Sequence, residues 1–189
     1  MDVQQRRQFA NNKQLDHGAR QRLFAGFWQE WHPRLRVYYR SFGGLSAEDG
    51  EELASDALLQ AFERADSYRP ERELAPWLYT VARRLALSRL RVLRRRPEQS
   101  TDPALFVDLA AAAEPGPEGC YMAGQERVLA ARLLNGLPEK ERELAYLVYG
   151  AELSLPQIAR LTGEPLGTVK WRMSTIRTRM RKQAEVLYG

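Results

Sequence analysis

Residues 154–182, SLPQIARLTGEPLGTVKWRMSTIRTRMRK, carry the pattern that decides the fold. Ser154 followed by Gln157 is a capping box, which starts a short helix. Gly163 suits the left-handed backbone that ends this helix, and Pro165 suits the first turn of a second helix. The apolar residues of the second helix recur at steps of three and four, so they form one buried stripe. A helix start, a tight turn and a second helix start in this order predict a helix-turn-helix motif.

The second helix also has a polar, cationic face opposite its apolar stripe. Between Pro165 and Gly189 six lysine and arginine side chains accompany one acid, Glu185. Hydroxyl, guanidinium and aromatic groups on a free helix face contact phosphates and base edges of DNA. An ordinary solvated helix can carry such a face too, but the ordered turn signals favour DNA binding. The residues predicted to bind DNA are Thr168, Lys170, Trp171, Arg172, Thr175 and Arg179.

The composition excludes several classes of protein. The 189 residues allow one large domain or two small ones, and the net charge of +5 favours a polyanionic partner. The single cysteine, Cys120, cannot form an internal disulfide, and with only His17 and His32 beside it no zinc site can be assembled. No metal or other cofactor is therefore expected. The N-terminus lacks a signal-peptide pattern, and no apolar run is long enough to cross a membrane, which predicts a cytoplasmic protein.

Charge divides the chain into two helical domains. The charged residues at 83–96 are all arginines, whereas 97–124 contains five acids, no lysine or arginine, and several prolines that interrupt helices. We predict an all-α fold of two small helical domains, at 23–96 and 125–189, joined by a flexible acidic linker at 97–124. The polar extension at 1–22 has no assigned role. From composition alone, we expect the linker to act only as a solvated tether between the two domains.

Helical periodicity gives the front domain a core and two exposed faces. A first helix starts near Leu23, and Pro33 is expected to bend or restart it. The next helix, at 51–64, has an apolar stripe opposite a polar one that contains an exposed leucine. A single exposed leucine needs no explanation, but it also fits a docking site. This opposite stripe consists of Glu52, Ser55, Asp56, Leu59 and Glu63.

A third front helix, opened by Pro76, runs over 77–96 with cations along one face. Aromatic side chains lie at its start, and no acid occurs within its arginine run at 83–96. Cations beside aromatic rings hold single-stranded nucleic acid, because charge follows phosphates and rings stack on bases. The alternative is that the rings belong to the core and the arginines are solvated. We favour the core for Trp77 and Tyr79, and nucleic acid for the arginines.

Two blocks of the sequence resemble a known family. EELASDALLQAFERADSYRPERELAPWLYTVARRLALSRLR, at 51–91, resembles the second conserved region of the sigma factors of bacterial RNA polymerase. LPEKERELAYLVYGAELSLPQIARLTGEPLGTVKWRMSTIRTRMRK, at 137–182, resembles their fourth region. The strings WLY and GTVK-x-R are distinctive, and the absence of a domain between the blocks is typical of the compact extracytoplasmic-function group.

This resemblance implies a promoter-specificity subunit with no catalytic activity, whose partners are core RNA polymerase and promoter DNA. It implies that the stripe Glu52, Ser55, Asp56 and Leu59 docks on the polymerase clamp helices, and that the rear helix reads the −35 element. The family usually has an anti-sigma partner, and its acidic linker runs toward the polymerase active centre as a mimic of nucleic-acid charge. The residues implied in melting and capture of the −10 strand are Tyr68, Arg69, Trp77, Thr80, Arg83, Arg84, Ser88 and Arg91.

The chain departs from the family pattern at faces that touch bases. Arg84 stands where asparagine is common, Ser88 where aspartate is common, and Trp171 where a small serine is usual, so the resemblance does not predict the promoter sequence. Two other functions stay open. One is a stand-alone helix-turn-helix regulator with a front dimerisation or sensor domain. The other is a DNA recombinase or nuclease, although no paired carboxylates or histidine constellation accompany Tyr79 and Ser88.

Overall fold

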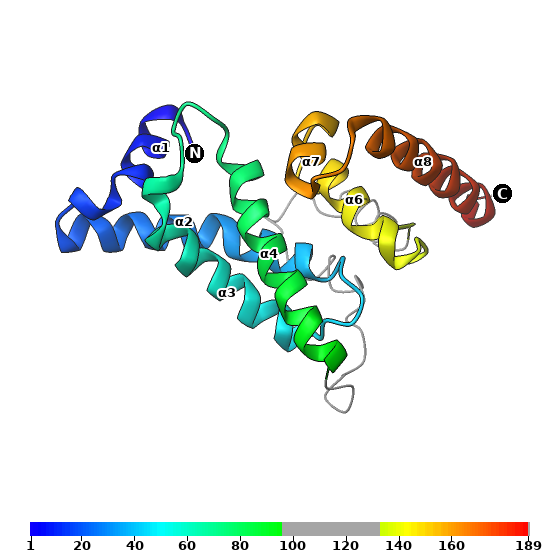
Figure 1. Ribbon diagram of the computed structural model, residues 1–189, viewed down its shortest axis with the longest axis horizontal. Helices are drawn as coiled ribbons and strands as arrows, with labels where there is room; N and C mark the ends of the chain where they lie inside the picture. Colours follow the sequence, from blue (N-terminus) through cyan, green and yellow to red (C-terminus); the bar gives the residue numbers. More distant parts are fainter. Residues whose placement is uncertain (96–132, 189) are drawn as a thin grey trace.

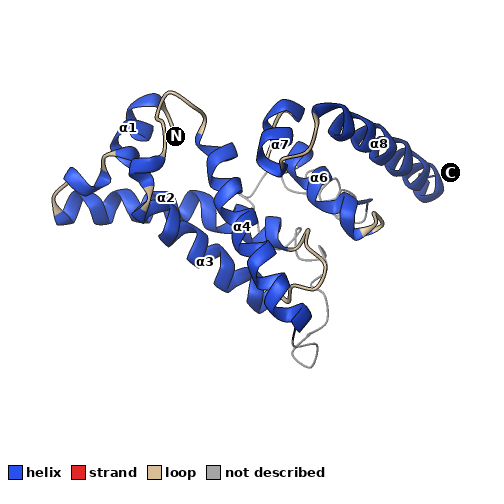
Figure 2. Cartoon of the chain, viewed as in Figure 1, coloured by secondary structure: helices blue, strands red, loops and turns tan. Residues whose placement is uncertain are grey.

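The structure is a computed structural model that describes residues 1–95 and 133–188, and this part of the chain contains helices and loops but no strand (Figure 2). The all-α prediction is confirmed. The predicted acidic linker at 97–124 lies outside the described residues. We call residues 1–95 the front lobe and residues 133–188 the rear lobe. The helices are α1 (Val3–Ala10), η1 (Asn12–Gln14), α2 (His17–Tyr39), α3 (Ala47–Glu63), η2 (Ala65–Ser67), α4 (Leu74–Arg95), α6 (Glu139–Tyr149), α7 (Leu155–Thr162) and α8 (Leu166–Tyr188).

The front lobe is built on three long helices, because α3 packs against both α2 and α4 (Figure 1). The apolar stripe predicted for the second helix is buried, and the side chains opposite it are exposed or half-buried. A capping box starts α3, since the Ser46 hydroxyl accepts from the Asp49 amide and the Asp49 carboxylate accepts from the Ser46 amide. The buried stripe consists of Leu53, Ala54, Ala57, Leu58, Ala61 and Phe62.

The helix α2 continues through Pro33, so the expected restart at this residue does not occur. Proline removes one N–H from a helix and usually kinks or breaks it. Pro33 lies on the exposed face of α2, where water can serve the carbonyl that loses its donor. Trp31 and Leu35 on either side are buried, so packing against the rest of the lobe holds the helix on both sides of the proline.

The rear lobe contains the predicted helix-turn-helix, formed by α7 and α8. Ser154 and Gln157 form the capping box of α7, and Gly163 ends that helix at φ +75° in the left-handed region. Pro165 directly precedes α8. Val169, Met173 and Ile176 from the predicted stripe are buried, with Leu166 and Met180 half-buried at its ends. The sequence prediction for this motif is therefore confirmed.

Ser154→Ala is expected to lower the free energy of unfolding by about 1 kcal/mol, because the α7 amides lose a side-chain acceptor. Ser174→Ala is the matched control, since Ser174 is exposed within α8 and caps nothing, and it should change stability by less than about 0.5 kcal/mol. Urea unfolding followed by circular dichroism measures both. Equal effects of the two variants would contradict a capping role for Ser154.

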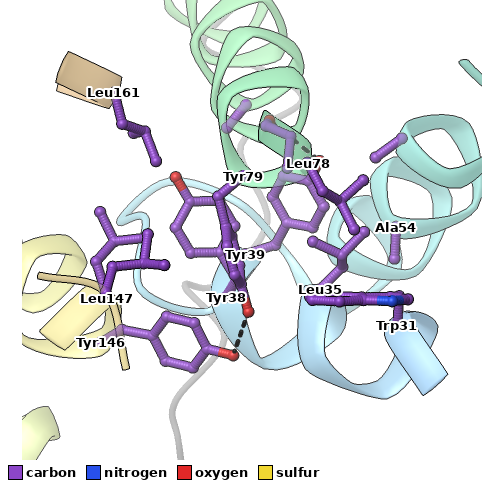
Figure 3. Close-up of a cluster of buried hydrophobic side chains, with 14 of the residues drawn as sticks. Trp31, Leu35, Tyr38, Tyr39, Ala54, Leu78, Tyr79, Tyr146, Leu147 and Leu161 are labelled. Carbon is purple, nitrogen blue, oxygen red and sulfur yellow. Dashed lines mark hydrogen bonds between the residues drawn. The ribbon is translucent and has the colours of Figure 1, made fainter. Parts of the chain in front are cut away.

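The two lobes pack against each other through aromatic side chains. The helix α4 contacts α7, and α2 contacts α6. Figure 3 shows side chains of both lobes in one cluster, with the hydroxyls of Tyr79 and Tyr146 facing each other at 3.4 Å. The Tyr146 hydroxyl also donates to the Arg34 carbonyl at 2.8 Å. Burial raises the pKa of Tyr146 well above its ordinary value, so this hydroxyl stays protonated and keeps donating.

Candidate nucleic-acid interface

A cleft of about 870 Å³ lies where the two lobes meet. Its front wall is the loop at 67–73 with the first turns of α4. Its rear wall is α7, which contributes Gln157, Arg160 and Leu161. The Gln157 Nε2 atom donates to Glu73 Oε2 at 2.5 Å, which joins the two walls. Four residues predicted to bind the −10 strand line this cleft: Tyr68, Arg69, Trp77 and Thr80.

The two aromatic rings of the cleft form a pair. The ring centroids of Tyr68 and Trp77 lie 5.3 Å apart at an interplanar angle of 47°. Tyr68 is buried, and its hydroxyl donates to the Arg72 carbonyl, so it is fixed in place. Trp77 is only half-buried. Both Trp77 and Tyr79 were predicted to lie in the core. Tyr79 does so, since it is 1% exposed, whereas Trp77 contacts both the core and the cleft.

The remaining predicted −10 residues follow α4 away from the cleft. Arg84, Ser88 and Arg91 are exposed along one side of the helix. Arg83 is different, because its Nε atom donates to Glu143 Oε1 of the rear lobe at 2.8 Å. Arg89 is also paired. The arginine run contains no acid of its own, but acids from α3 and α6 pair with Arg83 and Arg89 across the fold and relieve part of its repulsion.

The reading face of α8 leaves several predicted DNA-binding side chains exposed. Thr168 and Lys170 are exposed, and Trp171 is 69% exposed, which is unusual for so large an apolar ring. Thr175 is half-buried, and its hydroxyl donates to the Trp171 carbonyl at 3.2 Å. Arg179 is exposed but forms an ion pair with Glu141 at 3.2 Å. Thr168, Trp171, Thr175 and Arg179 lie on one side of α8, opposite its buried stripe, whereas Lys170 lies on a different side of the helix.

Arg172 has intramolecular partners that the sequence did not reveal. Its Nη1 atom donates to both carboxylate oxygens of Glu164 at 2.8 and 2.7 Å, and its Nη2 atom donates to the Lys140 carbonyl at 2.5 Å. Because both oxygens of the carboxylate accept from the same charged nitrogen, the ion pair fixes both side chains. The guanidinium therefore ties the turn before α8 to the start of α6, and it differs in this from the free side chains of Lys170 and Trp171.

A second hollow, of about 490 Å³, lies along α8 beside Trp171. Three of the residues that line it were not predicted from the sequence: Ser174, Thr178 and Lys182. These residues follow Trp171 at steps of three and four, so helical periodicity started from the exposed ring would have found them. They extend the polar face toward the C-terminal half of α8.

The predicted docking face on α3 is only partly free. The Glu52 carboxylate pairs with Arg89 of α4. The Ser55 hydroxyl donates to the Glu51 carbonyl at 3.1 Å. Asp56 is exposed and forms no ion pair with any residue of the described part of the chain, and Leu59 beside it is 46% exposed. Asp56 and Leu59 therefore form the accessible centre of this face.

Within the described ranges, no group of three or more histidine, cysteine, aspartate or glutamate side chains is placed to hold a metal ion. None of the helices in these ranges combines the length and apolar character that a membrane-spanning helix needs.

Comparison with known proteins assigns the chain to a family. Residues 27–96 match the family described as Sigma-70 region 2, and residues 133–182 match Sigma-70, region 4. The chain is 30% identical over 164 residues to the ECF RNA polymerase sigma factor SigW of Bacillus subtilis, with 78% of this chain and 81% of SigW covered. It is 29% identical over 160 residues to RpoE of Cereibacter sphaeroides, with 84% of each covered. The chain therefore belongs to the extracytoplasmic-function group of the sigma-70 family of RNA polymerase sigma factors.

Solved structures agree with this assignment. The sigma factor RpoE of Bartonella quintana, in complex with the anti-sigma factor NepR, matches 86% of this chain and 97% of that chain with a TM-score of 0.64 and 25% identity. CnrH, in complex with the cytosolic domain of CnrY, has the same fold, with a TM-score of 0.59 and 20% identity. Sigma factors are transcription initiation factors that bind core RNA polymerase and promoter DNA and direct promoter-specific transcription, which confirms the function predicted from the sequence.

Proposed function

We propose that this sigma factor recognises promoters with two separate surfaces, one on each lobe. The observation that carries the proposal is that two surfaces lie on one chain. One is the cleft whose front-lobe wall carries arginines and aromatic rings, and the other is the polar face of α8 with its exposed tryptophan. The front surface captures single-stranded −10 DNA, and the rear surface reads −35 duplex. Asp56 and Leu59 dock on core RNA polymerase.

The cleft suits a single strand because it offers both a ring and cations. Trp77 has a half-exposed indole beside the fixed ring of Tyr68. Stacking of a base on an aromatic side chain contributes about 1–3 kcal/mol and tolerates any base. Arg69 and Arg72 lie in the same wall, where they can follow phosphates, and the free stripe Arg84, Ser88 and Arg91 extends this path along α4.

The reading face suits a major groove because its free groups differ in chemistry. Lys170 supplies a mobile charge for phosphate, while Thr168 supplies a hydroxyl that bonds to base or phosphate. Trp171 presents an apolar ring, which matches the methyl group of thymine. Arg172 acts through the turn rather than on DNA directly, because its guanidinium is held by Glu164 and Lys140.

We further propose that the chain catalyses no reaction itself and acts in the cytoplasm, where core RNA polymerase works. A partner of the anti-sigma class fits as its regulator, since the similar RpoE of Bartonella quintana was solved with one.

Transcription from a randomised library tests this function. Core RNA polymerase is mixed with the purified chain and linear templates whose upstream region is random, and the transcripts are sequenced. We expect transcripts only when the chain is present, with two enriched elements upstream of their starts. Enrichment of a single element, or transcripts that do not depend on the chain, would contradict a two-surface reader.

Lys170→Ala and Arg172→Ala are expected to weaken binding to the −35 duplex in different ways. Lys170 is exposed, so its loss should remove one phosphate contact and reduce the slope of log affinity against log salt by about 1. Loss of Arg172 should lower the melting temperature and weaken binding at every salt concentration, because Glu164 loses its partner. Fluorescence anisotropy across a salt series measures the slopes. An unchanged affinity for both variants would show that this face of α8 does not bind DNA.

A further inference from the structure

The N-terminal segment packs behind the cleft as part of the front lobe, although the sequence assigned it no role. Phe9 of α1 is 0% exposed. Its ring centroid lies 4.7 Å from that of Phe27, 5.9 Å from Phe62, 6.0 Å from Tyr68 and 6.1 Å from Trp77. The segment therefore contacts, from the protein interior, both rings of the proposed single-strand site.

Polar contacts from the same segment hold the loop that forms the front wall. The Arg6 Nη1 atom donates to the Arg72 carbonyl at 2.7 Å, and the Tyr68 hydroxyl donates to this same oxygen. The buried Asn12 side chain donates to the Phe62 carbonyl at 2.6 Å. Lys13 pairs with Asp66 at 2.7 Å. Side chains of α1 and η1 therefore contact the stretch at 62–72 at both of its ends.

Arg6 and Phe9 are absent from the lining of the cleft, which consists of loop, α4 and α7 residues. The match to Sigma-70 region 2 begins at residue 27, so α1 and η1 lie before the matched region. A binding surface that is already ordered avoids the entropic cost of ordering on contact with its ligand. The N-terminal segment can order the loop in this way, because Phe9 packs on the Tyr68 ring and Arg6 donates to the Arg72 carbonyl.

We propose that α1 and η1 pre-order the −10 site, with Phe9 and Arg6 as positioning residues for Tyr68, Trp77 and the loop at 68–73. This inference rests on the proposed function of the cleft. It deepens that function by giving the N-terminal segment a part in the capture of the single strand, without contact between the segment and DNA.

The test compares two neighbouring arginines in holoenzyme assembled with core RNA polymerase. Arg6→Ala and Arg7→Ala each remove one positive charge from α1, but in the described structure only Arg6 contacts the loop. Affinity is measured by anisotropy for a labelled single strand carrying the −10 element found in the library, and for the −35 duplex. Arg6→Ala should weaken single-strand binding about threefold to tenfold, and Arg7→Ala less than about twofold. Binding of the −35 duplex should be unchanged for both.

A conservative replacement and a second variant complete the test. Arg6→Lys can still donate to the Arg72 carbonyl, so it should restore most of the affinity. Phe9→Ala, assayed well below its melting temperature, should weaken single-strand binding but not −35 binding. Equal effects of Arg6→Ala and Arg7→Ala would overturn the inference in favour of simple charge attraction.

Arg69→Ala separates failure of the inference from failure of the proposed function, because Arg69 lines the cleft itself. If Arg69→Ala weakens single-strand binding and Arg6→Ala does not, the positioning role is wrong and the site stands. If Arg69→Ala and Trp77→Ala both leave binding unchanged, the cleft is not the −10 site, and the inference falls with it.

Discussion

Asp56→Arg is expected to weaken binding of the chain to core RNA polymerase by about tenfold or more, which corresponds to about 1.4 kcal/mol. Asp56 is exposed beside Leu59 and has no ion-pair partner in the described part of the chain, so its charge is available to a partner. Reversal of that charge replaces an attraction at the interface by a repulsion of similar size. Because no internal pair is lost, the fold should be retained, and the melting temperature should change little.

Binding of fluorescently labelled chain to core enzyme at two ionic strengths measures this effect. Glu185→Arg makes the same charge change at an exposed site near the end of α8 and serves as the control. Leu59→Ala should weaken binding without changing its salt dependence, because it removes apolar contact area alone. Core affinity that is the same for Asp56→Arg and the unaltered chain would place the docking face elsewhere.

Glu143→Lys is expected to separate the two lobes. The Glu143 Oε1 atom accepts from Arg83 Nε at 2.8 Å and from the Tyr38 hydroxyl at 3.0 Å. Burial and the Glu143 carboxylate raise the pKa of Tyr38 well above its ordinary value, so Tyr38 remains a donor at all ordinary pH values. Lysine would leave this buried donor unpaired and place a cation beside Arg83. A loss of about 1–3 kcal/mol would shift the ratio of separated to packed lobes about 5- to 150-fold.

Small-angle X-ray scattering measures the separation as an increase in the radius of gyration. Glu141→Lys, two residues away on α6, is the control, because it breaks a pair with Arg179 inside the rear lobe and should leave the lobes packed. Under the proposed function, separation also frees Arg83 and removes α7 from the wall of the cleft, so single-strand binding should become tighter. An unchanged radius of gyration would show that the other contacts between the lobes, such as those of Tyr146 and Gln157, hold them together without Glu143.

Local patterns of the sequence were sufficient to predict α3, α4, α7 and α8, with the buried faces of α3 and α8, whereas α1 and α6 were not predicted. The predicted capping box at Ser154 and the left-handed turn at Gly163 both depend on groups within a few residues of each other. The buried face of α3 likewise follows from helical periodicity. Of the two outcomes predicted for Pro33, a bend or a restart, the restart does not occur, because packing of Trp31 and Leu35 against the lobe keeps α2 continuous.

Long-range partners could not be predicted, since nothing in the local pattern marks them. In the sequence, nothing distinguishes Arg83 and Arg172 from the exposed cations of the same helices. Their acids lie 60 and 8 residues away along the chain, and only the packing of α4 on the rear lobe and of α8 on the turn brings them together. The same holds for Phe9, whose four aromatic neighbours come from α2, α3, the loop and α4.

The sequence by itself therefore determined the class of fold, the helix-turn-helix and the family resemblance, because these depend on the period of a helix and on short motifs. The tertiary structure alone decided which cations of those helices are free to meet DNA, that the N-terminal segment supports the cleft, and that the rear lobe forms one of its walls. The reason is physical: helix formation is governed by neighbours within one or two turns, whereas the pairing of a charge or the burial of a ring depends on side chains that only folding brings into contact.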